Sequence, residues 1–223
     1  MTEITEHLRD IVERVARAAR LEQDTPNVTI VAVSKQKSSA AIAEAFRAGQ
    51  RDFGESYVQE GALKIDALRD LEIVWHFIGA IQANKTRLIA EKFQWVHTVD
   101  RAKIAARLNA HRPHFAPPLN VLIQVNQARE VQKSGVTESE VLPLARAIGA
   151  LPHLKLRGLM TIPPASDDPA HWFRELASLH ARLRGEGLEL DTLSMGMSAD
   201  FETAIAAGSN CVRIGTAIFG PRS

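Results

Sequence analysis

Two short runs near the end of the chain combine glycine with hydroxyl side chains, a combination that suits an anion-binding loop. Ser194, Gly196 and Ser198 belong to the first run, and Gly215 and Thr216 belong to the second. Each run follows an apolar segment of strand length. Glycine lets backbone N–H groups approach an anion closely, and the hydroxyl groups add further donors. The two runs therefore predict a phosphate-binding site at the ends of two strands.

A lysine stands at the end of another strand-like segment, close to the start of the chain. Lys35 follows residues 28–33, which are rich in β-branched side chains. An amine at such a strand end is partly desolvated, which favours its neutral, nucleophilic form. Lys35 is therefore a candidate nucleophile toward a carbonyl, whereas Lys37 fits a solvated lysine in the following loop.

An arginine completes the set of candidate groups. Arg213 lies two residues before Gly215, so the two residues would share one face of a strand. A reactive lysine, phosphate-binding loops and a cation match the aldehyde, phosphate and ring nitrogen of pyridoxal 5′-phosphate. Because arginine stays protonated, it would donate to the ring nitrogen and disfavour protonation there. Such a ring assists carbanion formation on a bound amino acid only weakly.

These groups need a scaffold that brings strand ends together. Strand-like segments alternate with helical segments along the chain, which predicts a parallel sheet covered by helices. Eight such strands predict closure into a single (β/α)8 TIM-type barrel. The predicted strands are 28–33, 51–54, 74–78, 95–99, 119–125, 156–160, 192–194 and 211–214. The predicted helices between them are 38–49, 55–68, 84–92, 101–108, 138–148, 170–184 and 199–207.

The first 25 residues predict an additional helix that packs on the barrel. Apolar residues recur there at helical spacing, and Pro26 would stop the helix. An open doubly wound sheet is the alternative fold, but its glycine-rich fingerprint is missing after residues 28–33. Because the composition does not change along the chain, we expect residues 1–223 to form one domain.

The composition argues against several classes of function. The 223 residues include 27 basic and 26 acidic side chains, so no single-sign field favours nucleic acid. No apolar run is long enough to span a membrane, and the first residues lack the apolar region of a signal peptide. Cys211 is the single cysteine, and no histidines are spaced as metal ligands. We therefore expect a cytoplasmic protein without a metal.

Ordered motifs along nearly the whole chain resemble the pyridoxal phosphate homeostasis proteins, a single-barrel family related to the N-terminal domain of alanine racemase. The motifs are Ala32-Val33-Ser34-Lys35, Phe53-Gly54-Glu55-Ser56-Tyr57-Val58-Gln59-Glu60, Trp75-His76-Phe77-Ile78-Gly79, Gln82-Ala83-Asn84-Lys85, Lys133-Ser134-Gly135, Arg157-Gly158-Leu159-Met160, Gly196-Met197-Ser198-Ala199-Asp200 and Val212-Arg213-Ile214-Gly215-Thr216-Ala217-Ile218-Phe219-Gly220.

The resemblance implies that Lys35 forms a Schiff base with pyridoxal 5′-phosphate and that Arg213 faces the ring nitrogen. It also implies that the phosphate is held by Ser198, Gly215 and Thr216.

Ser56, His76 and Met197 are further candidates for the cofactor site. Ser56 stands where the family usually has asparagine, so a contact there would pass through water. His76 fits a pocket-facing residue and a core histidine equally well.

Three functions compete. The first is a protein that buffers the cofactor and passes it to apoenzymes without substantial catalysis, and we expect a monomer because the β domain with the usual racemase dimer contacts is missing. An alanine-racemase-type enzyme is the alternative. Similar racemases carry a further C-terminal β domain and take a second acid/base tyrosine from a partner subunit, whereas this chain stops at Ser223 and has only Tyr57. A Schiff-base aldolase for phosphorylated sugars would leave Arg213 without a role.

Overall fold

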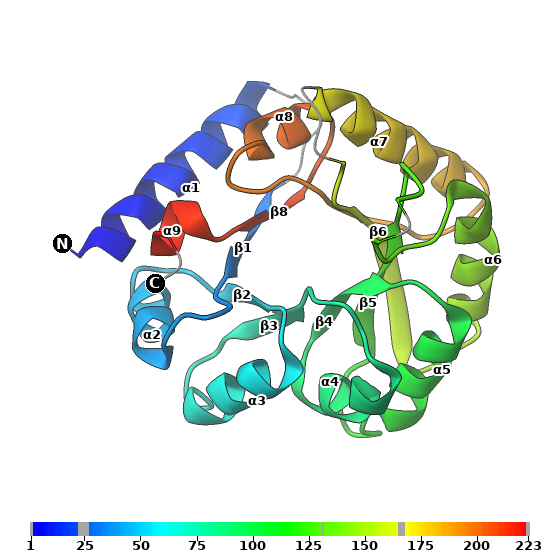
Figure 1. The fold of residues 1–223 in the computed structure, drawn as a ribbon, viewed down its shortest axis with the longest axis horizontal. Coiled ribbons are helices and arrows are strands. Elements are labelled where there is room, and N and C mark those ends of the chain that lie inside the picture. The colour runs from blue at the N-terminus through cyan, green and yellow to red at the C-terminus, as the bar shows by residue number, and fades with distance from the viewer. Residues whose placement is uncertain (1, 22–26, 131, 165–167, 222–223) are drawn as a thin grey trace.

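The chain folds into a closed barrel of eight parallel strands, in the order β1 to β8 with β8 pairing back onto β1 (Figure 1). The computed structural model describes residues 2–21, 27–130, 132–164 and 168–221. The predicted TIM-type barrel is confirmed. The assignment of residues 1–223 to a single domain stays a prediction. The strands are β1 (Thr29–Val33), β2 (Asp52–Glu55), β3 (Val74–Phe77), β4 (Trp95–Val99), β5 (Leu119–Val125), β6 (Leu154–Thr161), β7 (Thr192–Ser194) and β8 (Cys211–Ile214).

Helices surround the barrel and alternate with the strands along the chain (Figure 1). Their apolar faces pack against the outside of the sheet and form much of the core together with the strands. The helices between strands are α2 (Ser39–Arg47), α3 (Val58–Ala67), the short 3-10 helix η1 (Ala83–Lys85), α4 (Thr86–Lys92), α5 (Ala102–His111), α6 (Glu138–Gly149), α7 (Pro169–Gly185) and α8 (Phe201–Ala206). A four-residue helix, α9 (Thr216–Phe219), follows β8.

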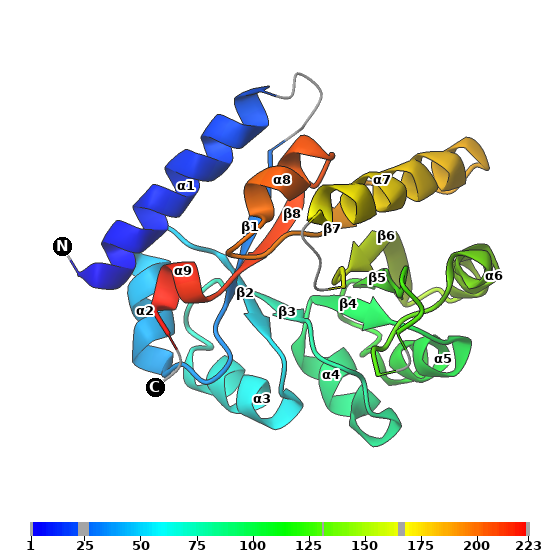
Figure 2. The ribbon, with the colours of Figure 1, turned by 45° about the horizontal axis from the view of Figure 1, so that its top comes forward.

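The additional N-terminal helix, α1 (Glu3–Leu21), runs along the outside of the barrel beside α8 and α9 (Figure 2). Leu8, Ile11 and Val15 form its buried stripe. Arg14 bonds to Glu202 of α8 through two nitrogen–oxygen contacts of 3.0 and 3.1 Å. The predicted N-terminal helix is thus present, and the expected stop before Pro26 lies outside the described residues.

Barrel closure is what brings the candidate groups together. β1 and β8 pair in register, with Val31 opposite Arg213 and Ala32 opposite Ile214. The residues that follow these two strands therefore emerge side by side at the carboxyl ends of the strands. Lys35 and Gly215, at opposite ends of the sequence, become neighbours at one mouth of the barrel.

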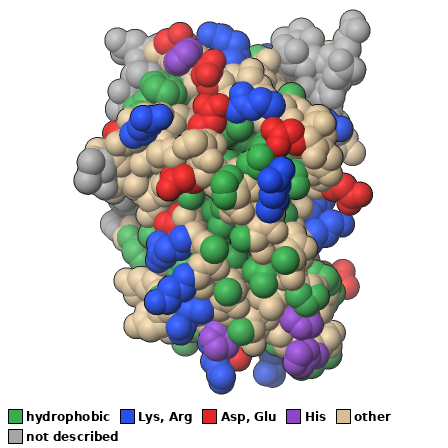
Figure 3. Space-filling model, turned by 90° about the vertical axis from the view of Figure 1, so that its right-hand side faces the viewer, with side chains coloured by type: hydrophobic (Ala, Val, Ile, Leu, Met, Phe, Trp, Pro, Cys, Tyr) green, Lys and Arg blue, Asp and Glu red, His purple; other side chains and the backbone are tan. Residues whose placement is uncertain are grey.

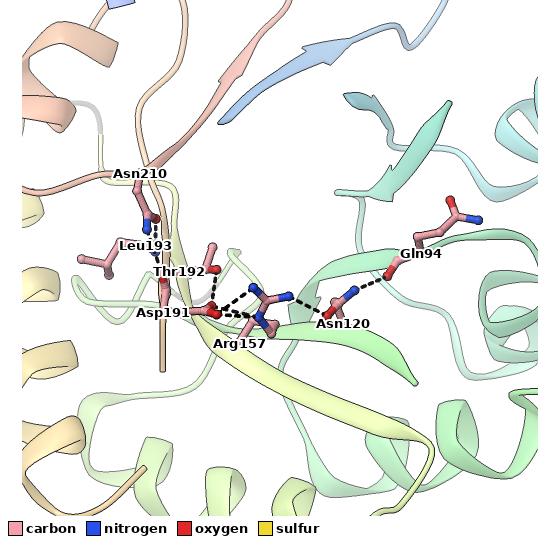
Figure 4. Close-up of polar contacts among 7 residues, drawn as sticks. All are labelled: Gln94, Asn120, Arg157, Asp191, Thr192, Leu193 and Asn210. Atoms are coloured by element: carbon pink, nitrogen blue, oxygen red, sulfur yellow. Dashed lines mark hydrogen bonds and ion pairs between the residues drawn. The ribbon is translucent and has the colours of Figure 1, made fainter. Parts of the chain in front are cut away.

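The opposite mouth is held together by a polar cluster (Figure 4). Arg157 of β6 donates to both carboxylate oxygens of Asp191, just before β7, at 2.7–2.9 Å. It also donates to Asn120 of β5, whose amide reaches the carbonyl of Gln94. The guanidinium carbon lies 4.8 Å from the centre of the Trp95 ring. This cluster ties β4 to β7 at their amino ends.

The surface gives no sign of a single-charge patch on the side beyond α5, α6 and α7. That face carries acidic and basic side chains interspersed with apolar and uncharged ones (Figure 3). The whole sequence has a net charge of +1. Within the described ranges, every helix is too short or too polar to cross a bilayer.

Candidate functional site

A cavity of about 320 Å³ opens at the carboxyl-end mouth of the barrel, which is the catalytic face of barrels of this type. Its volume lies within the range of small-molecule sites. The predicted residues on its wall are Lys35, Ser56, Met197, Ser198, Arg213, Gly215 and Thr216. The remaining wall residues are Val33, Lys37, Ile78, Ile162, Ala199 and Gly220.

Lys35 lies in the turn directly after β1, half-buried in the cavity wall. Within the described ranges its amine has no hydrogen-bond or ion-pair partner. Lys37 lines the same cavity, but its Nζ donates to the carbonyls of Phe219 at 3.1 Å and Pro221 at 2.7 Å. Lys37 therefore braces the segment after α9, which leaves Lys35 as the amine available for reaction.

The backbone before Lys35 is held by a buried ion pair. Glu55, fully buried at the end of β2, accepts from the hydroxyl of Ser34 at 2.6 Å and from Nζ of Lys64 at 2.8 Å. The same amine donates to the carbonyl of Ser34 at 2.7 Å. Burial raises the pKa of Glu55, while Lys64 and Ser34 oppose that rise. The ion pair thus fixes the residue that precedes Lys35.

The backbone after Lys35 is held by a second carboxylate of the same network. Glu60 pairs with Lys64 at 2.7 Å and accepts from the backbone N–H of Gln36. Gln36 has a φ of 61°, in the left-handed region that few residues other than glycine adopt. The contact with Glu60 holds this unfavourable turn, so Lys35 is clamped on both sides.

The network also corrects one sequence expectation. The helix predicted from residue 55 begins instead at Val58, and Glu55 belongs to strand β2. Glutamate favours helices intrinsically, but here the buried partners Ser34 and Lys64 keep it in the strand. The predicted start of the helix was therefore wrong.

Removing the cation of this network should destabilise the protein strongly. Lys64→Met leaves the carboxylates of Glu55 and Glu60 without their shared partner, and breaking a buried pair costs about 3–5 kcal/mol. Urea unfolding should show that loss in the free energy of unfolding. The control is Lys92→Met, which removes a more exposed pair with Asp66 and should cost less than about 1 kcal/mol. Equal losses in the two variants would contradict the clamp.

Arg213 of β8 reaches the same cavity from inside the barrel. Its side chain is almost fully buried, and burial lowers the pKa of its guanidinium. Nη1 donates to the hydroxyl of Ser194 at 2.6 Å, and Nη2 donates to the carbonyl of Thr161 at 2.9 Å. Two contacts on different strands thus fix the plane of the guanidinium.

The side of the cavity that carries the hydroxyl groups of Ser198 and Thr216 lies beside the short helices α8 and α9. The backbone N–H of Ala217, in the first turn of α9, is 3.5 Å from the hydroxyl of Ser198. Gly196 has a φ of 94°, and a Cβ there would lie 2.6 Å from Cβ of Ala204. The first glycine run can therefore turn tightly against α8 only because it carries glycine.

Ser56 and His76 occupy different surroundings. Ser56 follows β2 on the cavity wall, and a Cβ at Gly79 would lie 2.0 Å from its carbonyl oxygen, so the backbone after β3 packs directly on it. His76 is buried deeper in the barrel and is absent from the described cavity wall. Its ring nitrogens contact Asp52 and His97, each at 2.9 Å. The structure therefore places His76 as a core histidine with both nitrogens bonded.

Several residues around the site were missed by sequence reasoning. Ser34, Glu60 and Lys64 clamp Lys35, and only the i, i+4 spacing of Glu60 and Lys64 gave a signal. Ser194 belongs to the first glycine-rich run, but its hydroxyl points into the barrel toward Arg213. Helix α9 is too short to show a periodic pattern.

The groups on the wall have complementary chemistry. The cavity presents an available amine, a fixed guanidinium and two hydroxyl groups on adjoining loops. A ligand that carries a carbonyl, a nitrogen or oxygen acceptor and an anionic group could contact all of them. Pyridoxal 5′-phosphate has this set of groups, so the residues present fit the cofactor that the sequence predicts.

Comparisons with known proteins show the family of the chain. Residues 7–223 match the family model described as the alanine racemase N-terminal domain. A pyridoxal phosphate homeostasis protein of Vibrio alginolyticus is 52% identical over 230 residues, which cover all of this chain and 99% of the relative. The structure of PipY from Synechococcus elongatus, solved with PLP bound, is 34% identical with a TM-score of 0.83. The match covers 97% of this chain and 100% of PipY.

A more distant likeness concerns the fold alone. Alanine racemase of Corynebacterium glutamicum is 19% identical, with a TM-score of 0.71. The match covers 98% of this chain but 61% of the racemase, so the two share the barrel. By its full-length similarity at about half identity, the chain belongs to the pyridoxal phosphate homeostasis protein family, within the group that shares the alanine racemase N-terminal domain.

Proposed function

We propose that the chain binds pyridoxal 5′-phosphate in the 320 Å³ cavity and carries or buffers this cofactor, without substantial catalysis of its own. The observation that carries the proposal is the meeting of Lys35, Arg213 and the hydroxyls of Ser198 and Thr216 on one wall. The names of the relatives and the PLP-bound PipY structure support the same ligand.

Each wall group has a role in this proposal. Bound there, the cofactor would supply an aldehyde that condenses reversibly with an amine. Lys35 provides that amine, held in place by the clamp around its turn. Arg213 donates to the ring nitrogen, while Ser198, Gly215 and Thr216 hold the phosphate. Ser56 and Met197 line the same cavity and would contact the cofactor there.

The reversible covalent bond explains how such a protein could act as a carrier. A free aldehyde reacts with amines throughout the cell, whereas one bound to Lys35 is shielded and can still be released. We propose that PLP-dependent apoenzymes receive it in transient encounters, with the carrier monomeric and cytoplasmic. A racemase of the alanine racemase type is the alternative, and the shared barrel is the observation that favours it.

The experiment that tests the proposal is a transfer assay. Protein loaded with pyridoxal 5′-phosphate and freed of excess ligand is mixed with an inactive PLP-dependent apoenzyme, and recovery of that enzyme's activity is followed. We expect recovery to match the cofactor lost from the carrier. A protein that takes up no cofactor, or that never releases it, would contradict the proposal.

The phosphate contacts make a separate prediction. Thr216→Val should weaken binding of pyridoxal 5′-phosphate by about 1–3 kcal/mol, the range for hydrogen bonds to charged groups. The same variant should leave the weaker binding of phosphate-free pyridoxal unchanged. Titrations followed by absorbance measure both ligands, with Ser139→Ala on the outer helix α6 as the control. Equal losses for the two ligands would show that Thr216 does not face the phosphate.

A further inference from the structure

A continuous chain of hydrogen bonds crosses the inside of the barrel from Arg213 to Asp52. Nη1 of Arg213 lies 2.6 Å from the hydroxyl of Ser194, and that hydroxyl lies 2.9 Å from Nδ1 of His97. Nε2 of His97 lies 2.9 Å from Nδ1 of His76, and Nε2 of His76 lies 2.9 Å from a carboxylate oxygen of Asp52. This hydrogen-bond chain runs from β8 through β7, β4 and β3 to Asp52 on β2.

The members between the two ends are secluded from water. Ser194 and His97 are fully buried, and the side chain of His76 is 2% exposed. The side chain of Asp52, in contrast, is 28% exposed at the amino-end mouth of the barrel. The chain thus connects a guanidinium at the cavity with a carboxylate that meets solvent at the opposite mouth.

The direction of every hydrogen bond follows from its two ends. Arginine can only donate, so the hydroxyl of Ser194 accepts from Arg213. A carboxylate can only accept, so Nε2 of His76 donates to Asp52. A neutral His76 then accepts at Nδ1 from Nε2 of His97, and a neutral His97 accepts at Nδ1 from the hydroxyl of Ser194. Both rings are therefore Nε2–H tautomers, with all donors pointing toward Asp52.

The surroundings keep both imidazoles neutral. Burial lowers the pKa of His76 against the opposing effect of Asp52. Burial, together with the nearby His76 and Arg213, lowers the pKa of His97 well below its usual value. Trp95 stacks on His76 with the ring centres 5.5 Å apart. The guanidinium of Arg157 lies over the Trp95 ring and donates to Asp191. The neighbouring thiol of Cys211 also stays neutral, because burial raises its pKa to about 11.

We propose that Asp52, His76, His97 and Ser194 are positioning residues for Arg213, which hold its guanidinium toward the cavity and couple it to the carboxylate at the far mouth. This inference rests on the proposed function for the identity of the ligand. The chain fixes which guanidinium N–H groups remain for a ligand, because Ser194 and Thr161 take one nitrogen each. The remaining N–H groups can donate to an acceptor of a ligand in the cavity, such as a ring nitrogen.

The tautomers provide a test that needs no ligand. Long-range proton–nitrogen NMR spectra of the ligand-free protein at neutral pH should show both His76 and His97 as neutral Nε2–H rings. Asp52→Asn should shift the ring nitrogens of His76 and, through the shared hydrogen bond, those of His97. A protonated ring, an Nδ1–H tautomer, or a shift confined to His76 would overturn the proposed coupling.

A second test separates positioning from mere stability. Ser194→Ala should weaken binding of pyridoxal 5′-phosphate about tenfold, because the guanidinium loses one of its two anchors. It should leave unchanged the binding of a carba analogue that has carbon in place of the ring nitrogen. Ser209→Ala is the matched control, since the bonds of that buried hydroxyl in the described part of the chain go to backbone carbonyls of Leu193, Met195 and Cys211.

The outcomes of this test are distinct. Equal weakening of both ligands by Ser194→Ala would overturn the positioning role. If wild-type protein bound neither ligand, the proposed function would fail. The NMR measurement of the two histidine tautomers would still test the hydrogen-bond chain, because it needs no ligand.

Discussion

After pyridoxal 5′-phosphate is added and the excess is removed, Lys35→Ala protein should be colourless, whereas wild-type protein should stay yellow. The amine of Lys35 has no competing partner within the described ranges and lies on the wall of the cavity. Without it the aldehyde has no amine to condense with, although the phosphate contacts should still allow weak binding. Absorbance spectra before and after borohydride, with mass spectrometry of the labelled peptide, measure the loss.

Lys37 supplies the matched control for this prediction. It lies two residues further along and lines the same cavity, but its amine donates to the carbonyls of Phe219 and Pro221. Lys37→Ala should therefore keep the yellow colour and the borohydride label on Lys35. A label on Lys37 in wild-type protein, or a colourless wild type, would refute the assignment of the reactive lysine.

The second large expected effect is that the protein does not turn over amino acids. With pyridoxal 5′-phosphate bound, the protein should exchange the α-proton of L-alanine with deuterated solvent far more slowly than an enzyme. In the proposed site, Arg213 would donate to the ring nitrogen and so disfavour its protonation, which would weaken the ring as an electron acceptor. Nuclear magnetic resonance of the amino acid measures the exchange, with the free cofactor as the blank.

The described cavity wall argues separately against racemisation. Removing and returning a proton on opposite faces of a carbon needs two acid/base groups. Lys35 can serve as one, but Lys37 is held by two carbonyls, and Tyr57 is 54% exposed and absent from the wall. Exchange at about 1 per second or faster, the pace of ordinary enzymes, would favour the racemase alternative.

The barrel could be predicted from the sequence because the same pattern of a strand followed by a helix recurs along it. Eight strand-like segments alternate with seven helical segments between them, so small errors at single boundaries do not change the predicted topology. The site followed from the same pattern, since polar residues at strand ends meet at one mouth of any such barrel. Lys35, Ser198 and Thr216 are all residues of this kind.

The residues that support the site could not be predicted, because their roles depend on tertiary contacts. His76 and His97 lie within apolar strands, and a sequence does not show that their rings meet inside the barrel. Glu55 joined a strand against its helical preference because Ser34 and Lys64 bind its carboxylate there. In both examples the role of the residue is set by burial and by hydrogen bonds to residues far away in the sequence.

The pairing of β8 with β1 has a consequence for when the site comes into being. Lys35 is synthesised well before Gly215 and Thr216, which lie far along the chain on the opposite wall. At about 5–20 residues per second, many seconds pass between the synthesis of Lys35 and that of the opposite wall. A nascent chain therefore lacks the complete cavity, and ligand binding can stabilise only a chain whose barrel has already closed.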